Sequence, residues 1–175
     1  MLDLNGKTLL LNGEMAGSPG TKTQAFQFLK DSNIYLKNGT IESDDAKMMI
    51  QNYSNLTLDN VKVIGGTKAQ YVVSNNYGNV VFKNGTEIRA TEGNVAFDAY
   101  YGMNAIYDDG VTVTIEDGSV VIVGPIEYGK ANRATQEAFL ENTHIYKPTG
   151  YTLEAPTGYG WVDVGNNKEE LRPTT

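Results

Sequence analysis

The sequence predicts an all-β protein, built as a short parallel β-solenoid of about five coils. Short segments of alternating apolar and polar residues recur along the chain, and an Asn or Asp occupies the same place in each of them. The closest recurrences lie 22 to 24 residues apart. A period of that length with two or three short strands is typical of one solenoid coil. Each strand then pairs with its equivalent one coil later.

The first repeat is a clipped segment at 2–9, and four longer ones follow at 33–41, 55–63, 79–88 and 112–120. Their turn positions are Asn5, Asn38, Asn60, Asn84 and Asp117. Asn and Gly tolerate the left-handed backbone conformation that β-branched residues avoid. Stacked amide side chains can also hydrogen-bond from coil to coil. We therefore expect these five residues to form a structural turn ladder.

The apolar positions of the longer repeats should face a common core in continuous rows. These positions are Ile34, Leu36, Ile41, Leu56, Leu58, Val63, Val80, Phe82, Ile88, Val113, Ile115 and Val120. A second apolar run precedes each repeat, at 25–29, 47–50, 70–73 and 95–97, and predicts a second set of strands. A two-sheet sandwich is the alternative architecture, but it does not explain why Asn recurs at one phase of the repeat.

The coils are expected to occupy residues 1–147, and residues 148–175 to form a C-terminal cap with a loose tail. The open ends of a short solenoid expose unpaired strand edges, which must be covered. The first repeat begins at residue 2, which leaves no room for an N-terminal cap. Association with another subunit or with a larger assembly is therefore expected.

The run Leu-Asp-Leu-Asn-Gly-Lys-Thr at 2–8 and the Asn-Gly-Thr turns at 38–40 and 84–86 resemble repeats of right-handed parallel β-helix proteins of the pectate-lyase-like superfamily. They look most like phage decoration or fibre proteins and bacterial surface β-helix proteins, and the segment 151–164 is similar to their closing segments. The resemblance implies right-handed coils and a homo-oligomer, with a trimer favoured by analogy with phage spikes. It leaves the function open, because that superfamily contains lyases, hydrolases, adhesins and spacers.

Composition excludes several classes of function. The chain has 14 Lys and Arg against 21 Asp and Glu, for a net charge of −7, which argues against nucleic acid as a partner. It has no cysteine for disulfides or thiolate sites, and its one histidine, His144, rules out a multi-histidine metal site. No signal peptide or membrane span is visible, and we expect no metal and no cofactor.

A polysaccharide-processing enzyme, hydrolase or lyase, is the alternative function, and it would use Asp98, Asp108 and Asp109. Glycoside hydrolysis needs two carboxyl groups about 5–10 Å apart, one of them with a raised pKa. Asp98 and the Asp108–Asp109 pair could meet that spacing within one coil. The simpler interpretation of Asp108–Asp109 is a turn ahead of Gly110.

Tyrosine occurs 11 times, and three copies follow the second set of strands at matched positions, Tyr53, Tyr77 and Tyr101. Aligned along a solenoid they would form a stripe. Tyr offers a large apolar face with a polar tip, so such a stripe could close its own corners, bind another subunit, or contact a carbohydrate as in a carbohydrate-binding module.

The sequence therefore predicts a non-catalytic structural, decoration or adhesion module on a virion or on an extracellular, bacterial surface. Its expected partners are copies of itself and a capsid or cell-surface assembly, with carbohydrate as a further possibility. Acidic charge suits repeated display on such a surface.

Overall fold

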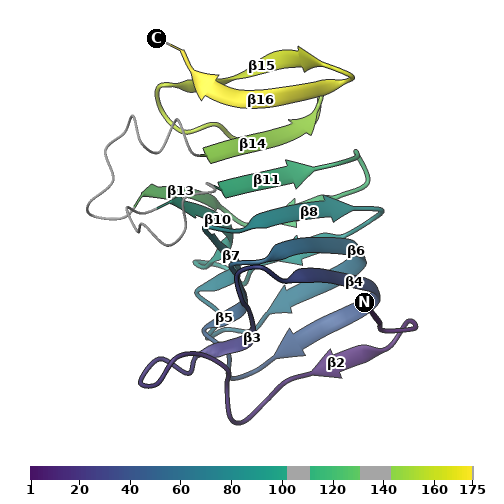
Figure 1. Cartoon of the computed structure of the whole chain (residues 1–175), viewed down its shortest axis with the longest axis vertical. Helices are drawn as coiled ribbons and strands as arrows, with labels where there is room; N and C mark the ends of the chain where they lie inside the picture. Colours follow the sequence, from purple (N-terminus) through teal and green to yellow (C-terminus); the bar gives the residue numbers. More distant parts are fainter. Residues whose placement is uncertain (102–110, 131–142, 175) are drawn as a thin grey trace.

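The computed structural model describes residues 1–101, 111–130 and 143–174. Within these ranges the chain forms β-strands and turns with no helix, and the strands lie in two sheets (Figure 1). All strand pairs are parallel except those that the C-terminal hairpin makes. The predicted all-β class with parallel pairing is thus confirmed.

The larger sheet has 11 strands and the smaller sheet has five. The strands of the larger sheet are β1 (Leu2–Asp3), β2 (Thr8–Leu10), β4 (Asn33–Ser43), β6 (Asn55–Gly65), β8 (Asn79–Lys83), β9 (Glu87–Arg89), β11 (Val111–Ile115), β12 (Val121–Val123), β14 (Thr143–Pro148), β15 (Tyr159–Gly165) and β16 (Lys168–Pro173). Those of the smaller sheet are β3 (Gln24–Phe28), β5 (Met48–Asn52), β7 (Tyr71–Asn76), β10 (Val95–Tyr101) and β13 (Ile126–Lys130). From β3 to β14 the chain passes back and forth between the sheets, so each strand pairs with one from the next repeat.

The longest strands, β4 and β6, turn at an asparagine. Asn38 and Asn60 lie at their centres with φ of 57° and 55°, in the left-handed region. One residue in that conformation changes the direction of an extended chain. As a result, β6 pairs with β8 before Asn60 and with β9 after it.

The core consists of rows of apolar side chains in register across the larger sheet. One row joins Leu36, Leu58, Phe82 and Ile115, all of which are buried. A second row runs Ile34, Leu56, Val80, Val113 and Ile145, of which Ile34 alone is only partly buried. The smaller sheet faces these rows, and the rings of Phe82 and Phe97 meet with centroids 5.7 Å apart.

The third row departs from the prediction at its last member. Ile41, Val63 and Ile88 are in register, but Ile88 pairs with Ile122 and not with Val120. The last turn, from Asp117, is longer than the preceding ones, so the paired strand begins later. Val120 is still buried, at 3% exposure, inside that turn.

The C-terminal segment is a hairpin of β15 and β16. β16 pairs antiparallel with β14 and so extends the larger sheet beyond its last parallel strand, at the top of Figure 1. The chain is paired as far as Thr174, whose amide donates to the carbonyl of Gly158 at 2.9 Å. The segment predicted as a cap therefore continues the sheet.

Candidate functional site

The outer face of the larger sheet carries a column of alternating charges. Asp3, Lys37, Asp59 and Lys83 lie directly opposite one another on β1, β4, β6 and β8. The Nζ of Lys37 is 3.8 Å from a carboxylate oxygen of Asp3, and the Nζ of Lys83 is 3.7 Å from one of Glu116. Opposite charges on facing residues favour this strand register over registers shifted by one or two residues. Exposed pairs of this kind stabilise a protein by only about 0–1 kcal/mol each.

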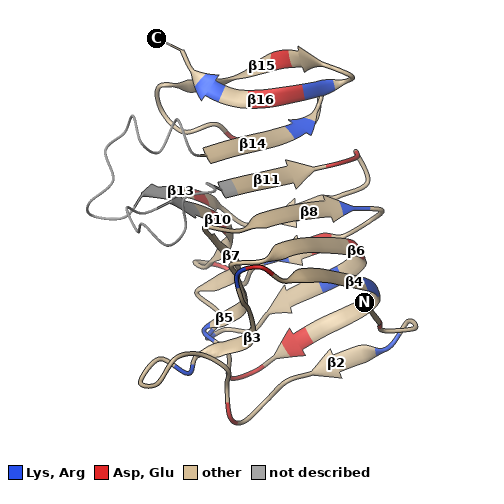
Figure 2. Cartoon of the chain, in the orientation of Figure 1, with Lys and Arg blue, Asp and Glu red and all other residues tan. Residues whose placement is uncertain are grey.

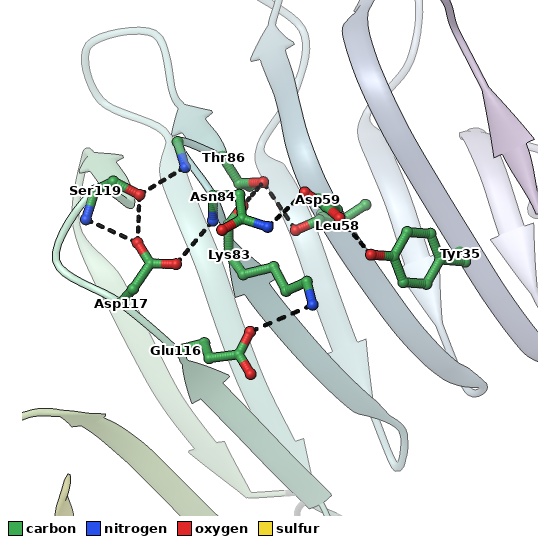
Figure 3. A network of polar contacts seen from close by, with 10 residues as sticks. Tyr35, Leu58, Asp59, Lys83, Asn84, Thr86, Glu116, Asp117 and Ser119 are labelled. Carbon is green, nitrogen blue, oxygen red and sulfur yellow. Dashed lines mark hydrogen bonds and ion pairs between the residues drawn. The ribbon is translucent and has the colours of Figure 1, made fainter. Parts of the chain in front are cut away.

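Asp59 is the centre of the network in Figure 3. The hydroxyl of Tyr35 and the amide of Asn84 both donate hydrogen bonds to its carboxylate, the second at 2.9 Å. These two hydrogen bonds, led by that of Tyr35, hold the pKa of Asp59 below its ordinary value. The same contact raises the pKa of the Tyr35 hydroxyl. The Asp59 carboxylate thus connects its own repeat with the repeats before and after it.

Four of the five predicted turn-ladder residues share one backbone conformation. Asn5, Asn38, Asn60 and Asn84 have φ between 51° and 57°. The amide of Asn60 donates to the side-chain oxygen of Asn38 at 3.1 Å. The amide of Asn38 lies 3.5 Å from Asp3 and that of Asn84 bonds to Asp59, so the ladder is joined to the charged column.

Asp117, the fifth predicted member, is not among the residues with positive φ. Its carboxylate instead accepts the backbone N–H of Asn84 at 2.9 Å, and the N–H and hydroxyl of Ser119 (Figure 3). These hydrogen bonds, led by that from Asn84, lower the pKa of Asp117. An aspartate that accepts local N–H groups is typical of a turn, and it here bonds to the turn of the preceding repeat.

Two further sets of asparagines were not predicted as ladders. On the surface, the amide of Asn79 donates to Asn55 at 2.8 Å and that of Asn55 donates to Asn33 at 3.2 Å. Inside the fold, the fully buried Asn52 donates to the equally buried Asn75 at 2.9 Å. All of them recur at spacings of 22 to 24 residues. That spacing was the signal in the sequence that could have identified them.

The structure describes the side chains of two of the three tyrosines in the predicted stripe, Tyr53 and Tyr77. The rings of Tyr53 and Tyr77 are stacked, with centroids 6.4 Å apart and planes inclined by 11°. Tyr77 has a φ of 61°, which is unusual for a residue with a bulky side chain. The backbone of Tyr101 ends β10, but its side chain lies outside the described residues. Beside the two rings is a hollow of about 60 Å³, also lined by Lys30, Asp31, Ser54, Asn55 and Asn79.

Asp98 lies on β10, and Asp108 and Asp109 are outside the described residues. Asp98 is 7% exposed, and burial raises its pKa to about 7. It is opposite Ser74 on one side and Glu127 on the other, and it accepts the backbone N–H of Asn75 at 3.1 Å. The hydroxyl of Tyr71 is 3.3 Å from a carboxylate oxygen of Glu127. The structure therefore brings a glutamate, and not a described aspartate, beside Asp98.

The C-terminal hairpin is joined to β14 by polar contacts of two neighbouring glutamates, Glu169 and Glu170, whose side chains are 17% and 11% exposed. Lys147 is 4% exposed, its Nζ lies 3.2 Å from Glu169, and it is 5.0 Å from the centre of the Trp161 ring. Glu170 is 2.9 Å from Nδ1 of His144 and 2.8 Å from Arg172. Burial alone would raise the pKa of Glu170, but its contacts with His144 and Arg172 hold that pKa below its ordinary value.

Within the described ranges no three or more His, Asp or Glu residues are grouped so that they could hold a metal ion. None of the described segments is a helix long and apolar enough to cross a membrane. Comparison of the chain with protein-family models, with curated proteins and with solved structures finds no match. The likeness to pectate-lyase-like β-helix proteins thus remains a resemblance between short sequence motifs.

Proposed function

We propose that the chain is a non-catalytic structural module, displayed on a virion or bacterial surface as a decoration or adhesion element and assembled as a homo-oligomer. One observation carries the proposal. Polar side chains on the outer faces bond to the equivalent residue of the next repeat, as Asn79, Asn55 and Asn33 do. Groups used in this way hold successive repeats together and in register.

The two sheets are proposed to belong to one right-handed parallel β-helix. In support, the chain alternates between the sheets, and each crossover joins parallel strands. Crossovers between parallel strands of one sheet are right-handed in about 98% of cases. A rigid stack of this kind, with an acidic surface, suits a role in display.

The second candidate function is polysaccharide processing, and the environment of Asp98 favours it. A carboxyl group with a pKa of about 7 can donate a proton near neutral pH, and the neighbouring Glu127 could act as the second carboxylate. The low exposure of Asp98 weighs against this function, because a general acid must reach the substrate. A carbohydrate-binding role would instead use the hollow beside Tyr53 and Tyr77.

The two functions differ in one assay. The full chain is incubated with polygalacturonate and with neutral glucans, and new reducing ends and unsaturated products are measured. The Asp98→Asn variant, which keeps a similar shape but cannot act as an acid, is the control. We expect no product from either protein. Product formed by the native chain and lost in the variant would overturn the structural proposal in favour of an enzyme.

A further inference from the structure

The two ends of the stack carry most of the exposed large apolar side chains. Seven such side chains are exposed among the described residues, and only Val121, on β12, lies outside the N-terminal end and β15. Four are at the N-terminal end and two are on β15: Met1, Leu2, Leu10 and Leu29, and Val162 and Val164. Apolar groups gathered at particular surfaces, while the rest of the surface is polar, mark a contact surface.

Both ends also present strands that are paired along one side only. In the described chain β1 and β2 pair with β4 alone, and β15 pairs with β16 alone. A strand edge of this kind has N–H and C=O groups free to bind another strand. Neither edge is blocked by a proline inside the strand.

The direction of β15 favours one arrangement of two copies. β16 is antiparallel to β14, and β15 is antiparallel to β16, so β15 runs in the same direction as β14, β11 and β8 (Figure 1). A second copy shifted along the stack without being inverted would place its β1 beside β15 in parallel orientation, because β1 begins the row of strands that β15 ends. This contact would continue the parallel order of the larger sheet.

The side-chain charges of the two ends are opposite in sign. Residues 1–30 contain three lysines and two carboxylates, for a net charge of +1, and residues 148–175 contain four carboxylates and two basic side chains, for a net charge of −2. Basic and acidic segments alternate along β16 (Figure 2). Contact between unlike ends is thus favoured over contact between like ends, which would also bring two copies of Asp163 together on β15.

We propose that copies of this chain associate head to tail, with the N-terminal edge of one copy, β1, on the β15 edge of the next. The inference rests on the proposed role as an assembling structural module and specifies the surfaces that would be used. A head-to-tail contact made by a shift along the stack involves no rotation that would close a ring, so the assembly grows along the axis of the stack.

Sedimentation velocity of the full chain tests the proposal, from about 1 µM to about 1 mM. We expect the mean mass to rise above 19.1 kDa with concentration and not to stop at a fixed multiple. Leu2→Lys and Val164→Lys place a charge on either edge, at side chains 41% and 37% exposed, and should each weaken association at least about tenfold. Val121→Lys is the matched control, because Val121 is 42% exposed but lies on β12.

Mixing the two edge variants gives the sharper result. Leu2→Lys retains a native β15 edge and Val164→Lys retains a native β1 edge, so an equimolar mixture should form a dimer of one copy of each and nothing larger. Circular dichroism and the thermal midpoint check that each variant is folded.

Three outcomes would overturn the head-to-tail contact: a monomer at every concentration, a closed trimer that neither edge variant affects, or a dimer that only one of them abolishes. A monomer that does not cleave polysaccharide would rule out this contact but not the proposed non-catalytic role. Cleavage of polysaccharide would rule out the non-catalytic role itself.

Discussion

Replacing Asp98 with asparagine should stabilise the protein at alkaline pH and not at acidic pH. The carboxyl is 7% exposed, and its pKa is raised from 3.8 to about 7 by burial, with Glu127 adding to the effect. A difference of about three pKa units corresponds to roughly 4 kcal/mol of unfolding free energy at most, since each unit is worth about 1.4 kcal/mol. Asparagine keeps an oxygen that can accept the N–H of Asn75.

The direction of the change in stability follows from the pH at which the folded and the unfolded chain each release the proton of Asp98. Below the unfolded-state pKa of 3.8 both states are protonated, and the native chain has its full stability. Between 3.8 and about 7 the unfolded chain is ionised while folded Asp98 still holds its proton, so stability falls as the pH rises. Above about 7 the loss is complete. The variant carries no charge at this position and escapes that loss.

Urea unfolding at about pH 4, 6 and 8 measures the difference between the native chain and Asp98→Asn. The other titrating groups are common to both proteins, so their effects largely cancel in the difference. We expect a difference close to zero at the lowest pH and an increasing advantage of the variant as the pH rises. Asp31→Asn removes a carboxylate at an exposed turn and should change stability by no more than about 0.5 kcal/mol. A variant no more stable than the native chain at about pH 8 would refute the reasoning.

Two more perturbations test the turn ladder and the C-terminal hairpin. Asn60→Val places a β-branched residue at a φ of 55° and removes the hydrogen bond to Asn38, so urea unfolding should show a loss of about 2–3 kcal/mol. Asn60→Gly, which tolerates that φ, should lose only about 1 kcal/mol, and equal losses would contradict the conformational explanation. The pKa of Glu170 is lowered on folding, so its contribution is present above the unfolded value of 4.5 and disappears as the pH falls through the folded value. Glu170→Gln should therefore cost about 1–3 kcal/mol at neutral pH and progressively less in acid, and a cost that does not depend on pH would argue against the contacts with His144 and Arg172.

The strands and their inward faces could be predicted because both depend on short-range patterns. Leu56, Leu58 and Val63 are buried where alternation places them, because successive side chains on a strand point to opposite faces. The exception at Val120 arose where one turn has a different length. Register beyond a turn depends on the number of residues that it contains, and the repeated motif does not show that number.

The candidate sites were harder to predict, because they depend on which repeats become neighbours. Asp98 could be identified as a carboxyl of interest, but its partner Glu127 lies on a strand 29 positions later and outside the repeat motif. Asn52 was not predicted as a site residue. Its side chain is fully buried, where it donates hydrogen bonds to Asn75 and to the backbone carbonyl of Asn79.

The sequence by itself determined the all-β class, the parallel repeat and the left-handed turns at Asn5, Asn38, Asn60 and Asn84, because strand alternation and left-handed turn conformation are properties of a few adjacent residues. Only the tertiary structure decided which charges face one another in the column from Asp3 to Lys83, how deeply Asp98 is buried, and that β15 runs parallel to β14. Those properties arise when distant segments are stacked at the spacing of neighbouring strands, and both the charge partners and the desolvation of a side chain are set by that stacking.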